Sequence, residues 1–139
     1  MILAKCIANS RRDLPDEESR AAYDRNIHLD EVGLVVGRRY VVYGIAFMGG
    51  DGLPWYLVCE EDDDGYPTPQ LGAFFDLVDG TVPEGWEVAM NTNAGDFAIL
   101  PSRWAHDPCF MEKLVDGEPE ATAYFRSLRE GYNDRWMSR

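Results

Sequence analysis

The middle of this chain combines the strongest strand signals of the sequence with a complete absence of positive charge. Between Arg39 and Arg103, 63 residues contain no Lys, Arg or His but eleven acidic residues. The flanks are almost neutral, since residues 1–39 carry seven acids and seven bases, and residues 103–139 carry seven acids and six bases. The middle segment therefore supplies nearly all of the net charge of −12. A folded sheet with charges of one sign attracts cationic partners and repels nucleic acid. The eleven acids are Asp51, Glu60, Glu61, Asp62, Asp63, Asp64, Asp76, Asp79, Glu84, Glu87 and Asp96.

Short strands separated by turn residues dominate the first hundred residues. Gly37 and Gly44 interrupt the second strand pattern and predict a turn or a bulge there. Residues 49–52, GGDG, predict a hairpin turn into the next strand. Residues 60–70 contain five consecutive acids, a Gly and two prolines, which predicts a surface loop and not a strand. Because no crossover helix separates the strands, we expect a small antiparallel barrel or a strongly bent sheet. The strand patterns occupy 2–8, 34–48, 55–60, 73–79, 86–90 and 97–100.

Length and composition predict one domain, and the strand patterns together with the C-terminal helical pattern predict a β-rich α+β fold. The chain has 139 residues, of which 45% are hydrophobic and 12% aromatic, so it can bury a core. We expect the barrel over about 1–100 and a helical part over about 105–131. An additional short helix is expected from a cap at Asp16 to Tyr23.

The C-terminal part has helical periodicity. Asp107 followed by a proline predicts a helix start, and Gly117 predicts its end. Pro119 starts a second predicted helix, whose apolar residues recur at the spacing of a half-buried face. Gly131 is the expected residue after its last turn, so residues 132–139 are expected to be loosely held.

Cysteine usage and hydropathy predict a cytoplasmic protein. Cys6, Cys59 and Cys109 are odd in number, far apart and contain no CxxC, which favours reduced thiols over disulfides. No apolar run approaches the roughly 18–20 residues that span a bilayer, and the first residues lack the order of a signal peptide. The acidity argues against direct binding to nucleic acid or to an anionic membrane.

Several segments resemble a family of small uncharacterised bacterial proteins. They are VGRRYVVYGI, WYLV, the acidic loop with prolines, AFFDLVDG, Trp86 and SRWAHDPCFMEKLVDGEPEA, which together cover roughly residues 36–90 and 102–125. The resemblance implies an SH3-like barrel with appended C-terminal helices. These motifs consist of packing and turn residues, and the resemblance supplies no catalytic residue.

The run of acids from Glu60 to Asp64 is the first candidate site. Glu60, Asp62, Asp64 and Gly65 match the start of a calcium-binding loop, but its twelfth position, which needs a Glu, is Leu71. Two interpretations of this run stay open. It is either a solvated loop that keeps the protein soluble or a patch that binds a cationic partner. Five adjacent carboxylates repel one another, and a cationic partner would relieve that repulsion.

The histidines, cysteines and glycines give weaker evidence for a functional site. His106 and Cys109 are three residues apart, which suits a metal or a Cys–His nucleophile pair. Zinc needs three or four ligands, so Cys6, Cys59 and His28 would have to converge in space. The alternative is that Cys109 is an ordinary buried cysteine and His106 a surface histidine, with no joint role in metal binding or catalysis. The glycines of 49–52 precede a strand and not a helix, which argues against a phosphate-binding loop.

Aromatic residues beside the acids suggest a binding groove. On the predicted strand 55–60, alternation places Trp55 and Leu57 on one face and Tyr56 and Val58 on the other, so one residue of each pair can be exposed. An exposed Tyr beside an acidic loop would bind a basic or proline-rich peptide. Tyr66 lies next to the acids in sequence.

These observations predict a binding protein and not an enzyme, without cofactor, metal or catalytic residues. Its acidic face would occlude a basic protein partner, most concretely as an immunity protein that neutralises a nuclease toxin. One alternative is a nucleic-acid mimic from a phage or mobile element that inhibits a host defence protein. Another is a metal-dependent enzyme that uses the acidic loop. The candidate partner-binding residues are Glu60, Glu61, Asp62, Asp63, Asp64, Tyr56 and Tyr66.

Overall fold

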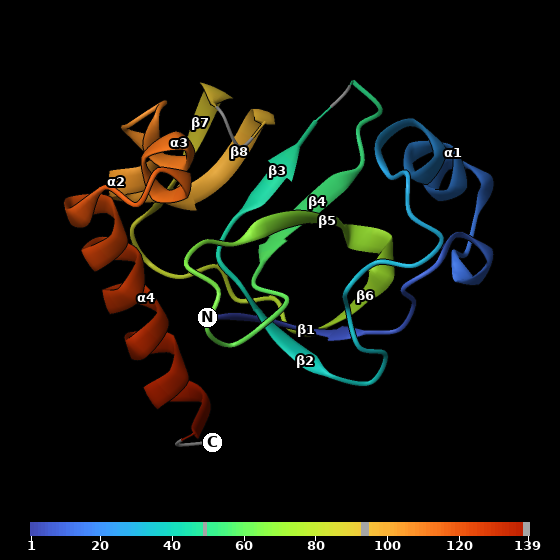
Figure 1. Cartoon of the computed structure of the whole chain (residues 1–139), viewed down its shortest axis with the longest axis horizontal. Coiled ribbons are helices and arrows are strands. Elements are labelled where there is room, and N and C mark those ends of the chain that lie inside the picture. The colour runs from blue at the N-terminus through green and yellow to red at the C-terminus, as the bar shows by residue number, and fades with distance from the viewer. Residues whose placement is uncertain (49, 93–94, 138–139) are drawn as a thin grey trace.

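The structure, a computed structural model, describes residues 1–48, 50–92 and 95–137. Within these ranges the fold is α+β, and its strands form two antiparallel sheets (Figure 1). One sheet has three strands in the order β2-β1-β6, and the other has five in the order β5-β4-β3-β8-β7. The elements in chain order are β1 (Ile2–Cys6), η1 (Arg11–Asp13), α1 (Glu17–Asn26), β2 (Arg39–Val42), β3 (Ile45–Phe47), β4 (Pro54–Val58), β5 (Thr68–Leu71), η2 (Gly72–Phe74), β6 (Phe75–Asp79), β7 (Trp86–Thr92), β8 (Gly95–Pro101), α2 (Ser102–Ala105), α3 (Phe110–Val115) and α4 (Pro119–Met137).

The expected closed barrel is not formed, because the strands separate into two sheets. The chain passes from one sheet to the other between β2 and β3, again through η2 between β5 and β6, and a third time between β6 and β7. At the first passage Tyr43 N donates to Leu57 O at 2.8 Å, and Leu57 N donates to Gly44 O at 2.9 Å. A Cβ on Gly44 would lie 2.6 Å from Leu100 Cδ2 and 2.8 Å from Leu57 Cδ1, so the backbone must come this close. The interruption predicted at Gly44 is therefore confirmed as the bend of the strand.

Strand β5 (Thr68–Leu71) begins in the segment 60–70 that the sequence predicts to be a loop, so that prediction is wrong for residues 68–70. Pro69 lies opposite Leu57 in this strand. Proline is tolerated because β5 is the edge strand of its sheet, where one side of the backbone has no ladder partner to lose. The remaining residues of the predicted loop, which include the acids, do connect β4 to β5.

The core lies on both faces of the three-stranded sheet. In β1, Leu3 packs with the residues of α2, α3 and α4, whereas Ile2 and Ala4 pack in the second cluster with the residues of α1. All three side chains are at most 2% exposed. The same alternation holds in β2, where Val41 joins the first cluster and Val42 the second. A sheet covered on both sides holds β2 rigidly, and β2 borders the site described below.

The N-terminal helix confirms its predicted cap and extends further than predicted. Asp16 Oδ1 accepts from Ser19 N at 2.8 Å, and the helix α1 continues past Tyr23 to Asn26. Gly37 adopts φ +92°, which confirms the predicted turn before β2. This turn places Arg38 immediately before the strand.

The C-terminal helices differ from the prediction in three places. The first is α2 (Ser102–Ala105), which precedes the predicted helix start. Helix α3 begins at Phe110, and Asp107 does not cap it directly but accepts from Cys109 N at 3.0 Å in the preceding turn. Helix α4 does not end at Gly131, and the predicted loose tail is helical through residue 137. Tyr132 explains the difference, because it is 7% exposed and its ring lies 5.9 Å from that of Tyr43. Such packing outweighs the cost of about 1 kcal/mol for a helical glycine. Gly117, with φ +73°, ends α3 as predicted.

Helix α4 runs along one side of the molecule, and α1 lies on the other side of the sheets (Figure 1). In the part of the chain that the structure describes, no helix combines the length and the apolar character needed to cross a membrane.

Candidate functional site

The acidic loop, defined as Glu60–Asp64, is held in place by an arginine from the middle of α4. Arg129 Nη1 donates to Asp62 O at 3.2 Å, and Nη2 donates to Asp64 O and contacts Cys59 Sγ at 3.0 Å. The guanidinium also lies 5.0 Å from the centre of the Phe125 ring. Arg129 thus binds the backbone of the loop and leaves its carboxylates free of this contact.

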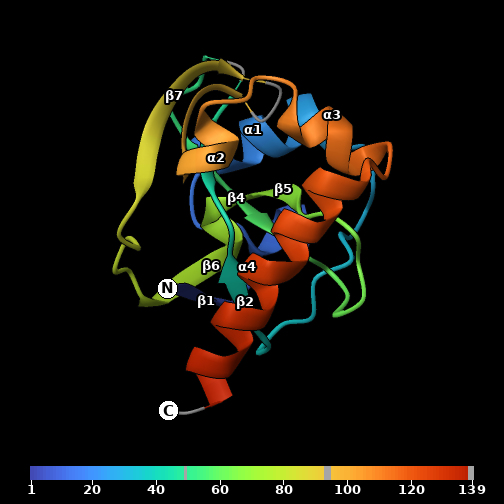
Figure 2. The same ribbon diagram turned by 90° about the vertical axis from the view of Figure 1, so that its left-hand side faces the viewer.

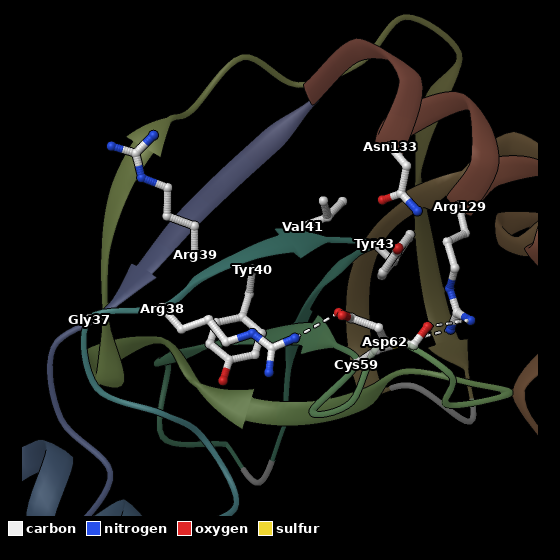
Figure 3. A pocket seen from close by; sticks show the side chains of 10 residues that line it. All are labelled: Gly37, Arg38, Arg39, Tyr40, Val41, Tyr43, Cys59, Asp62, Arg129 and Asn133. Atoms are coloured by element: carbon white, nitrogen blue, oxygen red, sulfur yellow. Dashed lines mark hydrogen bonds and ion pairs between the residues drawn. The ribbon is translucent and has the colours of Figure 1, made fainter. Parts of the chain in front are cut away.

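A second arginine reaches the loop from the turn before β2. Arg38 Nη2 pairs with Asp62 Oδ1 at 2.6 Å, and its guanidinium lies 5.3 Å from the centre of the Tyr40 ring. The Asp62 side chain is 96% exposed, so this ion pair lies at the surface and is weak. Figure 3 shows Arg38 extending toward Asp62, while Arg39 extends away from both.

The five acids of the loop divide into supporting and presented residues. Glu60 Oε1 accepts from Gln70 Nε2 at 2.8 Å, and its other oxygen lies so close to Gly33 that a Cβ there would be 2.3 Å away. Asp64 Oδ2 accepts from Glu61 N at 3.1 Å. The carboxylates of Glu60 and Asp64 therefore support the loop. The presented acids, which are exposed, are Glu61, Asp62 and Asp63.

The absence of bases from the middle segment does not keep bases away from these acids in space. It holds along residues 40–102, but Arg38 and Arg129 come from the two flanks and converge on the loop. The signal that could have revealed Arg129 is its place one turn after Phe125, next to Leu128 on the apolar stripe of its helix. A charged residue beside a buried stripe needs a partner, and here the partners are backbone oxygens.

A groove of about 740 Å³ lies between β2, α4 and the acidic loop. Burial raises the pKa of Tyr43 to about 12. Burial also raises the pKa of the Cys59 thiol, and the neighbouring Arg129, which lowers it, does not reverse that shift. The thiol is therefore protonated at neutral pH and is a poor nucleophile. The groove is lined by Gly37, Arg38, Arg39, Tyr40, Val41, Tyr43, Cys59, Asp62, Arg129 and Asn133 (Figure 3).

The two candidate tyrosines lie in different environments. Tyr56 is half-buried, and its ring lies 5.6 Å from that of Phe75. Its strand exposes little, since Trp55 is 3% exposed and Leu57 and Val58 are fully buried. Tyr66 is 37% exposed. A role for either residue in partner binding stays a prediction.

The other acids of the middle segment do not gather beside the loop. Asp76 lies on β6, which is separated from β2 by β1. Asp51 pairs with Arg25 at 3.1 Å, and Glu87 Oε2 lies 2.6 Å from His106 Nε2. The acidic loop is thus a local concentration of charge within a generally acidic surface.

The cysteines and histidines do not converge. Cys6 is buried and donates to Ala8 O at 3.3 Å, Cys59 contacts Arg129, and Cys109 is exposed. His106 faces Glu87 and not Cys109. Across the described ranges, no three or more His, Cys, Asp or Glu side chains are arranged to hold a metal ion.

Comparison with protein-family models, with curated proteins and with solved structures finds no match for this chain.

Proposed function

We propose that this protein binds a basic protein partner through the presented acids Glu61, Asp62 and Asp63. One observation carries the proposal: Arg129 binds the backbone oxygens of the loop and leaves these carboxylates exposed. A loop that is ordered before binding loses less conformational entropy when it docks, so each contact contributes more to affinity. A loop that only kept the protein soluble would not need this support.

The charge of the whole chain acts in the same direction. At a net charge of −12 the protein attracts a cationic partner over a distance comparable to the Debye length, which is about 8 Å at physiological salt. The concrete form of the proposal is an immunity protein that fills the basic substrate cleft of a nuclease toxin. We place it in the cytoplasm, where such a toxin acts. The SH3-like relation of its sheets and the resemblance to small bacterial proteins stay predictions.

Two alternatives use the same residues. A nucleic-acid mimic would present its carboxylates at phosphate spacing to a DNA-binding or RNA-binding protein. If this protein inhibits a host defence protein and not a toxin, the mimic is the correct alternative. A metal-dependent enzyme would need the loop acids as ligands, whereas Asp62 pairs with Arg38 and Glu60 with Gln70.

Association kinetics with a short Lys/Arg-rich peptide and with a panel of basic nuclease domains would test the proposal. The test variant is E61Q/D62N/D63N, which removes three charges and leaves Glu60 and Asp64 in place. The matched control is D30N/E84Q/D116N, which removes three exposed charges that make no ion pair within the described residues. We expect the test variant to associate roughly tenfold more slowly at low salt, and the difference to shrink as salt rises. Equal slowing in both variants would mean that only net charge matters and would refute a specific role for the loop.

A further inference from the structure

The five-stranded sheet is packed on one face, and its opposite face opens toward β7, away from Ile45 and Tyr56, which pack against the second core cluster. On the packed face Ala46, Ala89 and Ala98 are at most 6% exposed. The open face carries two cross-strand rows, Ile45–Ile99–Val88 and Phe47–Phe97–Met90, across β3, β8 and β7. We call these six residues the outer face.

Exposure on the outer face increases toward the edge of the sheet. Ile45, Phe47, Phe97 and Ile99 are partly exposed, and the Phe47 and Phe97 rings lie 5.3 Å apart. On β7, Val88 is 60% exposed and Met90 is 64% exposed. The apolar rows thus continue to β7, the last strand of the sheet, where the side chains of Val88 and Met90 remain exposed to solvent. Contiguous exposed apolar surface of this kind marks an interaction site in soluble proteins.

Strand β7 also has a free edge. It pairs only with β8 within the described residues, and Figure 2 shows it along the outer margin of the molecule. Its backbone N–H and C=O groups on the outward side are therefore available for another strand. An added strand would extend both the hydrogen-bond ladder and the apolar rows.

The charges beside this edge indicate what kind of strand fits. The strands of this sheet contain two charged residues, Glu87 and Asp96, and both are acidic. Glu87 lies on β7 between the outer-face positions, and its side chain is 46% exposed. Its Oε2 lies 2.6 Å from His106 Nε2, a contact that an incoming Lys or Arg would replace. A second copy of this chain would bring a further net charge of −12 to this edge, whereas a basic segment is attracted to it.

We propose that β7 accepts an extended segment of a basic partner in which apolar residues alternate with Lys or Arg. Alternate side chains of a strand point to opposite faces, so the apolar residues would cover Val88 and Met90, and the bases would lie on the side of Glu87. The positive charge of the partner rests on the proposed function. The docking surface is separate from the acidic loop, so the two can fail independently.

Fluorescence anisotropy with a labelled, alternating Lys–Val peptide about eight residues long would test this proposal. The comparison peptide has the same composition with its Lys and Val residues in two blocks. The test variant is V88T/M90Q, which keeps charge and strand propensity while removing apolar surface. The matched control is V36T/L77Q, because Val36 and Leu77 are 53% and 52% exposed and lie outside the five-stranded sheet. Circular dichroism would verify that each variant is folded.

We expect the protein to bind the alternating peptide about tenfold more tightly than the block peptide, and V88T/M90Q to lose about tenfold of that affinity. The control should bind as the parent protein does. Equal affinity for both peptides, or full affinity in V88T/M90Q, would overturn the proposal. Sedimentation that shows a dimer dissociated by V88T/M90Q would also overturn it, because the edge would then bind a second copy.

The variant E61Q/D62N/D63N separates this proposal from the proposed function. If it loses peptide binding while V88T/M90Q retains it, the acidic loop is the docking site and β7 is not. If V88T/M90Q loses binding and the loop variant retains it at moderate salt, β7 docks the strand, and the role of the acidic loop is decided separately by the association kinetics of the loop variant against its control.

Discussion

Replacing Arg129 tests whether one side chain orders the acidic loop. Arg129→Met keeps an apolar stem against Phe125 but removes the donors to Asp62 O, Asp64 O and Cys59 Sγ. A hydrogen bond from a charged donor contributes about 1.5–3 kcal/mol, and partial exposure of Arg129 lowers this to roughly 1 kcal/mol for each contact. We therefore expect the free energy of unfolding to fall by about 3 kcal/mol.

Urea unfolding would measure that loss, and hydrogen exchange would locate it. The amides of residues 59–64 should exchange faster in Arg129→Met, because the loop opens without its anchor. Arg129→Lys should lose about half as much stability, since an ammonium is a point charge and cannot span several acceptors as a planar guanidinium does. Arg126→Met is the control, because Arg126 is exposed on the same helix and its removal changes net charge equally. An Arg129→Met variant as stable as the control, or loop exchange that stays unchanged, would refute the reasoning.

Three further substitutions test the fold. Gly131→Ala should raise the free energy of unfolding by about 1 kcal/mol, because Gly131 lies inside α4 and a Cβ there contacts nothing within 4 Å; a fall in the thermal midpoint would contradict this. Gly44→Ala should lower the free energy of unfolding by about 1–3 kcal/mol in urea unfolding, since the new Cβ overlaps the buried side chains of Leu57 and Leu100. An unchanged urea midpoint would refute this close approach. The pKa of Tyr43 is raised from 10.0 to about 12, so the folded state retains a proton that the unfolded state releases, and stability falls as pH rises above 10. Between pH 10 and 11.5 the parent protein should lose about 1.5 kcal/mol more than Tyr43→Phe in urea titrations; equal losses would mean that Tyr43 titrates normally.

Local signals in the sequence predicted those features whose cause is local. Asp16 caps α1 through a bond to the third residue after it, and Gly37 and Gly117 adopt positive φ values that few other residues tolerate. Gly44 was also recognisable, because a glycine in a run of β-branched and aromatic residues indicates a bend.

Features that depend on distant residues were not predictable in the same way. Pro69 argues against a strand until its place at the edge of the sheet is known. Gly131 argues for a helix end until Tyr132 is seen to pack on Tyr43. The same limit applies to the candidate site, where the acids are evident in the sequence but Arg129 is 65 residues from Asp64.

That separation has a consequence for synthesis of the protein on the ribosome. The acidic loop is translated 65 residues before the arginine that anchors it, which at 5–20 residues per second is a delay of roughly 3–13 s. During this interval the nascent chain carries five adjacent carboxylates without their support from α4. The contacts of Arg129 with the loop can form only after α4 has emerged and docked, so a chain truncated before residue 129 would lack this anchor and keep only the contacts within residues 1–128.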